Sequence, residues 1–310
     1  MSADNLFTLW GVNAGGTLVG GIKSYSVKPG MKVDTPLASG QARGRVQFIP
    51  EGKPVVDFTT YAVGSALTAL TTLGKLIASM SGGLVLYGQC RDDGTASAKA
   101  GSNHLSFTYA SGLLMPTRVT AQAGKNRGYA EMTVNGIITF DGSNAPLIPA
   151  SGVALPAGLT EAEYYGLGPA TAAVAIPQLT SLDVAFGIGA ESKGSSEGKQ
   201  FDTAVWINEV KPVITLKGTS PTTFTDAVIP LNGRITTQVN TKFYLRRYDP
   251  TTGRFYEDNV AQHIKIVAAG LAVISSVDAG QGEAEITVEL PVVWDGTHEC
   301  LVTTVGSTIS

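Results

Sequence analysis

The sequence contains one pattern that could support nucleophilic catalysis. Residues 194–198 read GSSEG and fit Gly-x-Ser-x-Gly, with Ser196 as the nucleophile and His263 and His298 downstream as candidate bases. Such a nucleophile must lie on a strained turn between a buried strand and a helix, which holds its hydroxyl in place. Ser196 instead falls in a polar segment that corresponds to an earlier loop around Gly40. We therefore expect a flexible loop at this position.

Histidines and glycines give no cofactor or metal site. His104 and His263 are 159 residues apart, and neither has a cysteine or histidine at the spacing of zinc ligands. Gly187 and Gly189 lack the third glycine and the following helix of a dinucleotide loop, and no Gly-Lys-Ser/Thr phosphate loop occurs. The sequence thus predicts no catalytic, cofactor-binding or metal-binding residues.

Acidic residues beside glycines are the remaining candidates for cation binding. The Asp92-Asp93 pair and Asp141 could bind calcium. Aspartates at such places usually stabilise the turn through their own side chains, and we interpret these as turn formers at hairpin tips. The protein is therefore not expected to be an enzyme.

The composition indicates a protein that is largely covered by partners. At 310 residues the chain is expected to hold about two domains. Charged residues make up only 15%, and a bare surface so poor in charge tends to self-associate. The net charge of −3 and the lack of a basic run argue against tight, sequence-specific DNA binding.

An internal repeat organises the chain. Residues 130–142 (AEMTVNGIITFDG) return as residues 284–296 (AEITVELPVVWDG), at an offset of 154. Both copies alternate β-branched and aromatic residues with polar ones and end in Asp-Gly, as a strand entering a tight turn does. Earlier segments match at an offset of 158, for example Lys53 with Lys211 and Gly112 with Gly270. The difference falls in a turn, where changes in length are tolerated.

The repeat predicts how the chain is divided. We expect an N-terminal arm or edge strand over residues 1–21, a first β domain over 22–148, a linker over 149–175 and a second β domain over 176–310. Residues 65–80 carry apolar residues at helical spacing between Ser65 and Gly82 and predict a helix. Its counterpart, residues 223–238, contains Pro230 and Asn232-Gly233 and has either lost the helix or is misread. A capping box predicts a short helical turn at 160–163.

Cysteine usage and hydropathy bear on the compartment. Cys90 and Cys300, the only cysteines, stand at non-equivalent places in the two copies, so we expect two reduced thiols and maturation in a reducing cytosol. We expect no signal peptide, and no apolar run reaches the roughly 18–20 residues of a membrane helix.

Two strand–loop–strand units, residues 22–58 and 180–216, each contain a long polar loop, 28–44 and 186–202, and precede a hairpin and the paired Ala-Glu-x-Thr-Val strands. In this arrangement the chain resembles the major tail proteins that form the tail tube of long-tailed, siphovirus-like bacteriophages. The resemblance is to the type in which a duplicated tube domain makes trimeric, pseudo-hexameric rings. It covers nearly the whole chain and depends on architecture and on the repeat. It implies a mainly-β fold of two tandem, duplicated tail-tube-like β-sandwich domains with a small helical component.

The resemblance also implies a function, that of a structural virion protein. Stacked homotrimeric rings would form the conduit through which double-stranded DNA passes during ejection, without binding to the wall. Partners would be other copies, the tape measure protein and the tail terminator or distal tail proteins, and assembly would take place in the host cytoplasm. Charged residues of the two long loops look like the ring-stacking contacts of the family, the alternative being that they are only solvated. They are Asp34, Arg43, Arg45, Glu191, Lys193, Glu197 and Lys199.

Two other functions stay open. A tail-tip, distal tail or adhesin-type β-sandwich protein would bind a receptor or glycan through exposed aromatic residues on loops. Trp206 and Trp294 instead align with Phe48 and Phe140 of the other copy and are expected in the core. An esterase-like enzyme would need Ser196 buried beside a histidine.

Overall fold

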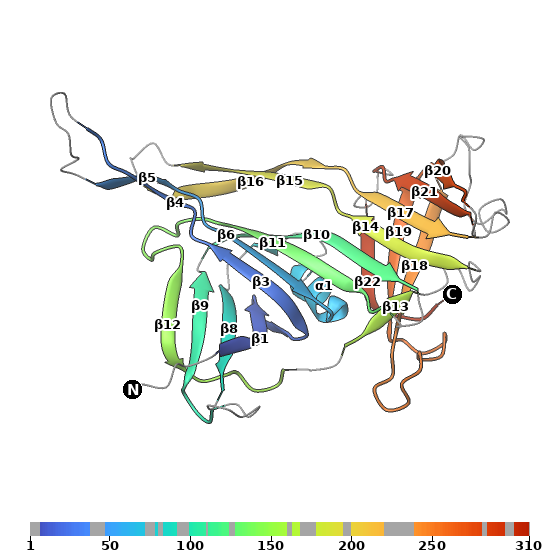
Figure 1. The fold of residues 1–310 in the computed structure, drawn as a ribbon, viewed down its shortest axis with the longest axis horizontal. Helices are drawn as coiled ribbons and strands as arrows, with labels where there is room; N and C mark the ends of the chain where they lie inside the picture. Colours follow the sequence, from blue (N-terminus) through green and yellow to red (C-terminus); the bar gives the residue numbers. More distant parts are fainter. Residues whose placement is uncertain are drawn as a thin grey trace.

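The computed structural model describes residues 7–37, 47–71, 78–79, 83–91, 99–109, 111–123, 128–159, 163–167, 178–194, 200–219, 239–280, 284–294 and 301–309. Regular structure in these residues is almost entirely β, in antiparallel sheets, and α1 (Val63–Thr71) is their one helix. The predicted mainly-β fold with a small helical component is therefore confirmed (Figure 1).

One long sheet runs through both halves of the chain. Its strand order is β20-β21-β17-β14-β10-β11-β6-β3, and the short β7 also pairs with β10. The halves meet where β14 pairs antiparallel with β10. The strands of this sheet are β3 (Ile22–Lys28), β6 (Val55–Thr60), β7 (Ala78–Ser79), β10 (Gly112–Gln122), β11 (Glu131–Ile138), β14 (Leu179–Ala185), β17 (Val213–Gly218), β20 (Val273–Asp278) and β21 (Glu285–Pro291).

Each half also has a smaller sheet of its own. In the first half the order is β12-β9-β8-β1-β2, and in the second it is β13-β18-β19-β22. Side chains of β6 and β8 alternate between buried and half-buried, because one face of each sheet packs into a shared hydrophobic core. The strands are β1 (Phe7–Ala14), β2 (Thr17–Val19), β8 (Leu84–Cys90), β9 (His104–Tyr109), β12 (Ile148–Val153), β13 (Tyr165–Leu167), β18 (Val239–Arg247), β19 (His263–Gly270) and β22 (Leu301–Ser307).

The two halves share one pairing pattern. The order β10-β11-β6-β3 recurs as β20-β21-β17-β14, and β12-β9-β8-β1 recurs as β22-β19-β18-β13. β10 has a bulge after Pro116 and β20 has one after Ile274, at the offset of 158 seen in the sequence. Ser151 of β12 and Val305 of β22 are 154 residues apart. Each lies opposite the second residue of the neighbouring strand, directly after the histidine that begins that strand. The structure thus follows both sequence offsets.

The structure corrects the predicted arm and linker. Residues 7–19 form β1 and β2, and β1 pairs with β8 along its length, so this part of the expected arm belongs to the first small sheet. Within the expected linker, β12 forms the edge of that sheet and β13 pairs with β18 of the other half. Because β1 and β13 hold the same place in their sheets, each half begins with this strand. The glycines and small residues of these segments give no strand pattern in the sequence. The segments are ordered by pairing with a neighbouring strand.

The helix is shorter than predicted. α1 lies within the expected range apart from its first two residues, and Leu67 and Leu70 are buried as the spacing indicated. By β7 the chain is extended and pairs with β10, so strand pairing replaces helix well before Gly82. The predicted counterpart at 223–238 and residues 160–162 of the predicted helical turn lie outside the described residues.

Candidate assembly surfaces

Each of the two segments predicted as a long polar loop contains the first strand of a β-hairpin. β4 (Met31–Asp34) pairs with β5 (Phe48–Gly52), and β15 (Ile188–Gly194) pairs with β16 (Asp202–Val210). Both ribbons leave the long sheet on the same side and extend beyond it (Figure 1). The strands inside the predicted loops, β4 and β15, were missed because none of their side chains is buried, which removes the buried–exposed alternation of an ordinary strand.

Three of the seven predicted inter-ring residues lie on these ribbons. Asp34 ends β4, Glu191 and Lys193 lie on β15, and all three are exposed. Glu191 Oε1 accepts a hydrogen bond from Asn208 Nδ2 across its own hairpin (2.9 Å). The other four, Arg43, Arg45, Glu197 and Lys199, lie outside the described residues.

Apolar side chains are also exposed at these ribbons, which corrects the prediction for the two tryptophans. Trp206 on β16 is 42% exposed and Trp294, just after β21, is 64% exposed, so neither is in the core. The physical reason for Trp206 is that a two-stranded ribbon has no second layer to cover its faces. Other exposed apolar residues of the hairpins are Met31, Val33, Leu37, Ile207 and Val210.

The two ribbons contact each other near their bases. Gly52 at the end of β5 donates its backbone N–H to the carbonyl oxygen of Gln200 (2.7 Å). A Cβ at Gly52 would lie only 2.5 Å from Cε1 of Phe201, so any larger residue would have to displace the Phe201 ring. The hairpins of the two halves are therefore positioned as a pair.

The joint between the halves combines a buried apolar pair with a surface ion pair. Val119 of β10 lies opposite Val184 of β14, and the two are 1% and 0% exposed. On the other face, Arg118 Nε donates to both carboxylate oxygens of Asp183 at 2.8 and 2.9 Å. This hydrogen bonding raises the pKa of Arg118.

A short segment before β13 also ties the halves together. Glu163 Oε2 accepts hydrogen bonds from the backbone N–H (2.9 Å) and the hydroxyl (2.7 Å) of Ser65 in the first turn of α1. Its other oxygen lies 3.8 Å from a guanidinium nitrogen of Arg247 on β18. Glu163 thus caps the helix of one half while it faces a cation of the other half. Its negative charge is favoured at a helix N-terminus because the helix dipole is positive there.

The uncovered face of the long sheet is polar, and its charges are paired. The four basic residues in the strands of this sheet each lie within 4 Å of a carboxylate on another strand. The pairs are Lys23–Glu131 (2.7 Å), Lys28–Asp57 (3.9 Å), Arg118–Asp183 and Lys217–Glu285 (2.9 Å). Hydrogen bonds to the glutamates raise the pKa of Lys23 and Lys217, so both amines stay charged.

The residues that suggested catalysis have structural surroundings. Gly194 ends β15 inside a hairpin, while residues 195–199, including Ser196, and His298 lie outside the described residues. His263 is fully buried, and its Nδ1 accepts the backbone N–H of Arg247 (3.3 Å) while Nε2 lies 3.0 Å from the carbonyl oxygen of Glu257. His104 likewise accepts the backbone N–H of Cys90 (3.1 Å). The sequence reasoning missed this shared role, although the matching positions of the histidines hinted at it.

The described aspartate turns are closed by their own side chains. Asp141 accepts hydrogen bonds from the backbone N–H groups of Ser143 and Asn144, and these bonds lower its pKa. Asp249 accepts hydrogen bonds from the backbone N–H of Thr251 and the hydroxyl of Thr252, which lower its pKa. The Asp92-Asp93 pair lies outside the described residues. Within the described ranges, no three His, Cys, Asp or Glu side chains are grouped as metal ligands.

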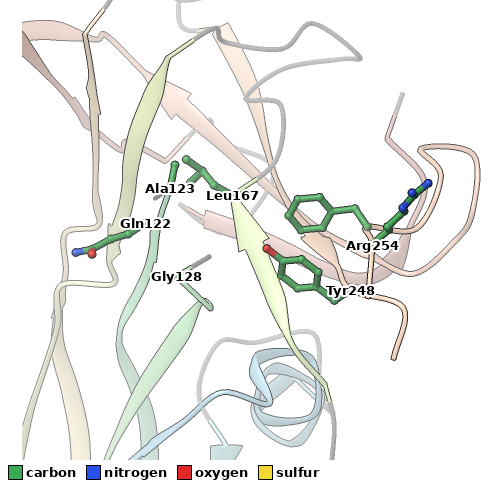
Figure 2. A pocket seen from close by; sticks show the side chains of 7 residues that line it. Gln122, Ala123, Gly128, Leu167, Tyr248 and Arg254 are labelled. Carbon is green, nitrogen blue, oxygen red and sulfur yellow. The ribbon is translucent and has the colours of Figure 1, made fainter. Parts of the chain in front are cut away.

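A cavity of about 330 Å³ lies where the halves meet beside β10 and β13. Tyr248 and Phe255 stack along it with ring centroids 4.2 Å apart. Figure 2 shows Gln122 and Arg254 on opposite sides with their polar ends pointing apart. Small-molecule sites usually have polar groups that converge on the ligand, and these two side chains do not converge.

No protein-family model matches the chain, and no curated protein matches its sequence. Among the described residues, no helix is both long and apolar enough to cross a membrane.

Proposed function

We propose that this protein is a tail tube subunit, a structural virion protein whose rings stack into a conduit for DNA. The observation that carries the proposal is the long sheet. It passes unbroken through both halves, and each half contributes the same four strands in the same order. Within the described residues, the outer edges of its two end strands, β3 and β20, pair with no other strand and are open to a partner. Closed rings are the usual way in which subunits with unlike, complementary edges satisfy them.

The uncovered face of the sheet supports passage of DNA. Tight nucleic-acid binding needs cations that are free to replace the counterions of the phosphates. Here every lysine and arginine in the strands of the long sheet has a carboxylate neighbour. A lumen lined by this face would therefore let a duplex slide without holding it.

The two hairpins support stacking of the rings. They extend from the same end of the sheet and expose apolar side chains such as Trp206 and Ile207 beside charged ones such as Asp34 and Lys193. An exposed ribbon that combines apolar and charged residues is suited to contact with another protein surface. We assign this contact to the neighbouring ring.

Electron microscopy of negatively stained protein tests the proposal. Purified protein at increasing concentration should form hollow rods or stacked rings. The double variant Trp206→Ser/Ile207→Ser should still form rings but far shorter rods, whereas Ile148→Ser, at an exposed residue of β12, should leave rod length unchanged. Particles that stay monomeric at every concentration, in the absence and presence of a crowding agent, would contradict a tube subunit.

The exposure of Trp206 and Trp294 favours a second candidate, a distal tail or adhesin-type protein that binds a receptor or glycan. Exposed aromatic side chains are frequent anchors in such interfaces. This candidate predicts a small, finite oligomer, and binding to host cells that is lost in Trp206→Ser. Rod formation by the wild-type protein would favour the tube.

A further inference from the structure

The two open edges of the long sheet correspond to the two edges that are joined inside the chain. β3 holds the place of β14 in its half, and β20 holds the place of β10. Among the described residues, no strand pairs with the outer edge of β3 or β20. The internal joint, β10 with β14, therefore shows how β20 of one copy can meet β3 of another.

The register of this second joint follows from the strand pairings. Val184 pairs with Ile214 and Val27 pairs with Val56, and Ile214 and Val56 are related by the offset of 158. Val27 is thus the counterpart of Val184. In the same way Val119 lies opposite Met132 and Val277 lies opposite Ile286, two residues related by the offset of 154, so Val277 is the counterpart of Val119. The internal pair Val119–Val184 predicts the pair Val277–Val27 between copies.

Apolar side chains are exposed at the free edge that β20 forms. Val119 is 1% exposed, whereas its counterpart Val277 is 59% exposed. Met115 is 4% exposed, whereas its counterpart Val273 is 40% exposed. An edge strand with exposed apolar side chains tends to pair with another chain. The C-terminal edge thus exposes apolar side chains at positions whose counterparts in the first half are buried.

Charge complementarity points to the same partner. In the predicted register Ser276 lies opposite Lys28, and Asp278 lies opposite Ser26, both on the polar face. Lys28 and Asp278 are therefore diagonal neighbours, about 7–8 Å apart at their backbones and within reach of a lysine side chain. In the internal joint, Arg118 and Asp183 form an ion pair across the corresponding two residue pairs, along the opposite diagonal. In this register the joint between copies would have one ion pair, as the internal joint does.

We infer that the open edges bind a second copy of this chain: β20 pairs antiparallel with β3 of the next copy, with Val277 opposite Val27 and Lys28 beside Asp278. This inference rests on the proposed function, because it specifies the joint within a ring. It assigns one register and one ion pair, which the proposed function alone does not.

Cysteine cross-linking tests the register. Opposed residues of antiparallel strands have Cα atoms about 4.5–5.5 Å apart, which suits a disulfide. Oxidised Val27→Cys/Val277→Cys should form covalent oligomers on a non-reducing gel. Tyr25→Cys/Val277→Cys, two residues out of register, and the wild-type protein, with its own two cysteines, are the controls and should stay largely monomeric. Equal cross-linking of both double variants would overturn the register.

Charge reversal tests the ion pair. Lys28→Glu and Asp278→Lys should each raise the concentration for half-assembly about five- to tenfold, because like charges across strands repel. The double reversal Lys28→Glu/Asp278→Lys should return it to near the wild-type value, and this rescue also excludes misfolding or the nearby Asp57 as the cause. Lys265→Glu, on β19 of the smaller sheet, is the matched control. Mass photometry gives the populations.

The outcomes separate the inference from the proposed function. If the wild-type protein forms rings, the charge reversals assemble as it does, and Val27→Cys/Val277→Cys cross-links no more than the off-register control, the joint is wrong while the ring stands. If the wild-type protein forms a finite oligomer other than a ring and Val27→Cys/Val277→Cys still cross-links selectively, the joint stands and the tube does not.

Discussion

Arg118 on β10 and Asp183 on β14 form an ion pair across the strand junction that joins the two halves of the protein. The side chain of Arg118 is 59% exposed and that of Asp183 is 23% exposed, so water and salt screen their attraction. Directly behind them Val119 and Val184 are almost fully buried. The apolar pair therefore supplies most of the stability of the junction, and the ion pair contributes chiefly to its register.

Substitutions at the junction should separate these two contributions. Arg118→Ala should lower the free energy of unfolding by less than about 1 kcal/mol, as for other exposed ion pairs. Val184→Ala should lower it by about 2 kcal/mol, because it removes buried methyl groups and leaves a cavity. Urea denaturation followed by circular dichroism measures both, with Val33→Ala on the exposed hairpin as control. A larger loss in Arg118→Ala than in Val184→Ala would reverse this ranking.

Glu163 should matter more to stability than its place outside any helix or strand suggests. Glu163→Ala removes the acceptor for the backbone N–H and hydroxyl of Ser65 and the carboxylate facing Arg247. We expect a loss of about 1–3 kcal/mol in the free energy of unfolding. Glu163→Gln keeps an acceptor oxygen and should cost less than half of this. Equal losses in the two variants would mean that the charge, and not the cap, is what stabilises the fold.

The repeat could be read from the sequence because its clearest strands are half-buried. Met132 and Val134 of β11 face the core at 0% exposure, which imposes alternation on this strand. β1 and β12 have no such signal, since glycines and small residues are ordered there by pairing with distant strands. The hairpins lack it because no second layer covers them. The joint of β10 with β14 was also beyond local patterns, since it pairs Val119 of one half with Val184 of the other.

The glycine at the base of each hairpin should be irreplaceable. Gly187 has φ +58°, and a Cβ there would lie 1.9 Å from the carbonyl oxygen of Lys211. Gly30 has the same geometry beside Lys53, at 2.0 Å. Gly187→Ala should therefore lower the free energy of unfolding by several kcal/mol, the sum of backbone strain and overpacking. Gly15→Ala is the matched control, with φ +57° and no atom near its Cβ, and should cost only about 1–2 kcal/mol. Calorimetry distinguishes the two, and equal losses would exclude the close approach as the cause.

Acid should weaken the protein partly through two turns. The pKa values of Asp141 and Asp249 are lowered below 3.8 by hydrogen bonds from their turns. A lowered carboxyl pKa in the folded state gives a stabilisation that is complete above the unfolded-state pKa and is lost as the pH falls through the folded-state value. Asp141→Asn/Asp249→Asn should therefore lose less stability than the wild-type protein between about pH 5 and pH 2. Unfolding midpoints across this range measure it, and parallel curves would show that these turns do not contribute.

Mixing two charge-reversed variants tests whether rings close with an odd number of copies. Lys28→Glu alone and Asp278→Lys alone each place like charges at every joint between identical copies. At a joint between the two different variants the charges are again opposite, whichever variant contributes β20. A ring of three cannot alternate two kinds of subunit, so at least one repulsive joint remains in it. We expect the mixture to form open chains and few closed rings, while the double reversal in one chain closes normally. Native mass spectrometry counts the copies, and closed rings of four or six from the mixture would contradict closure by three.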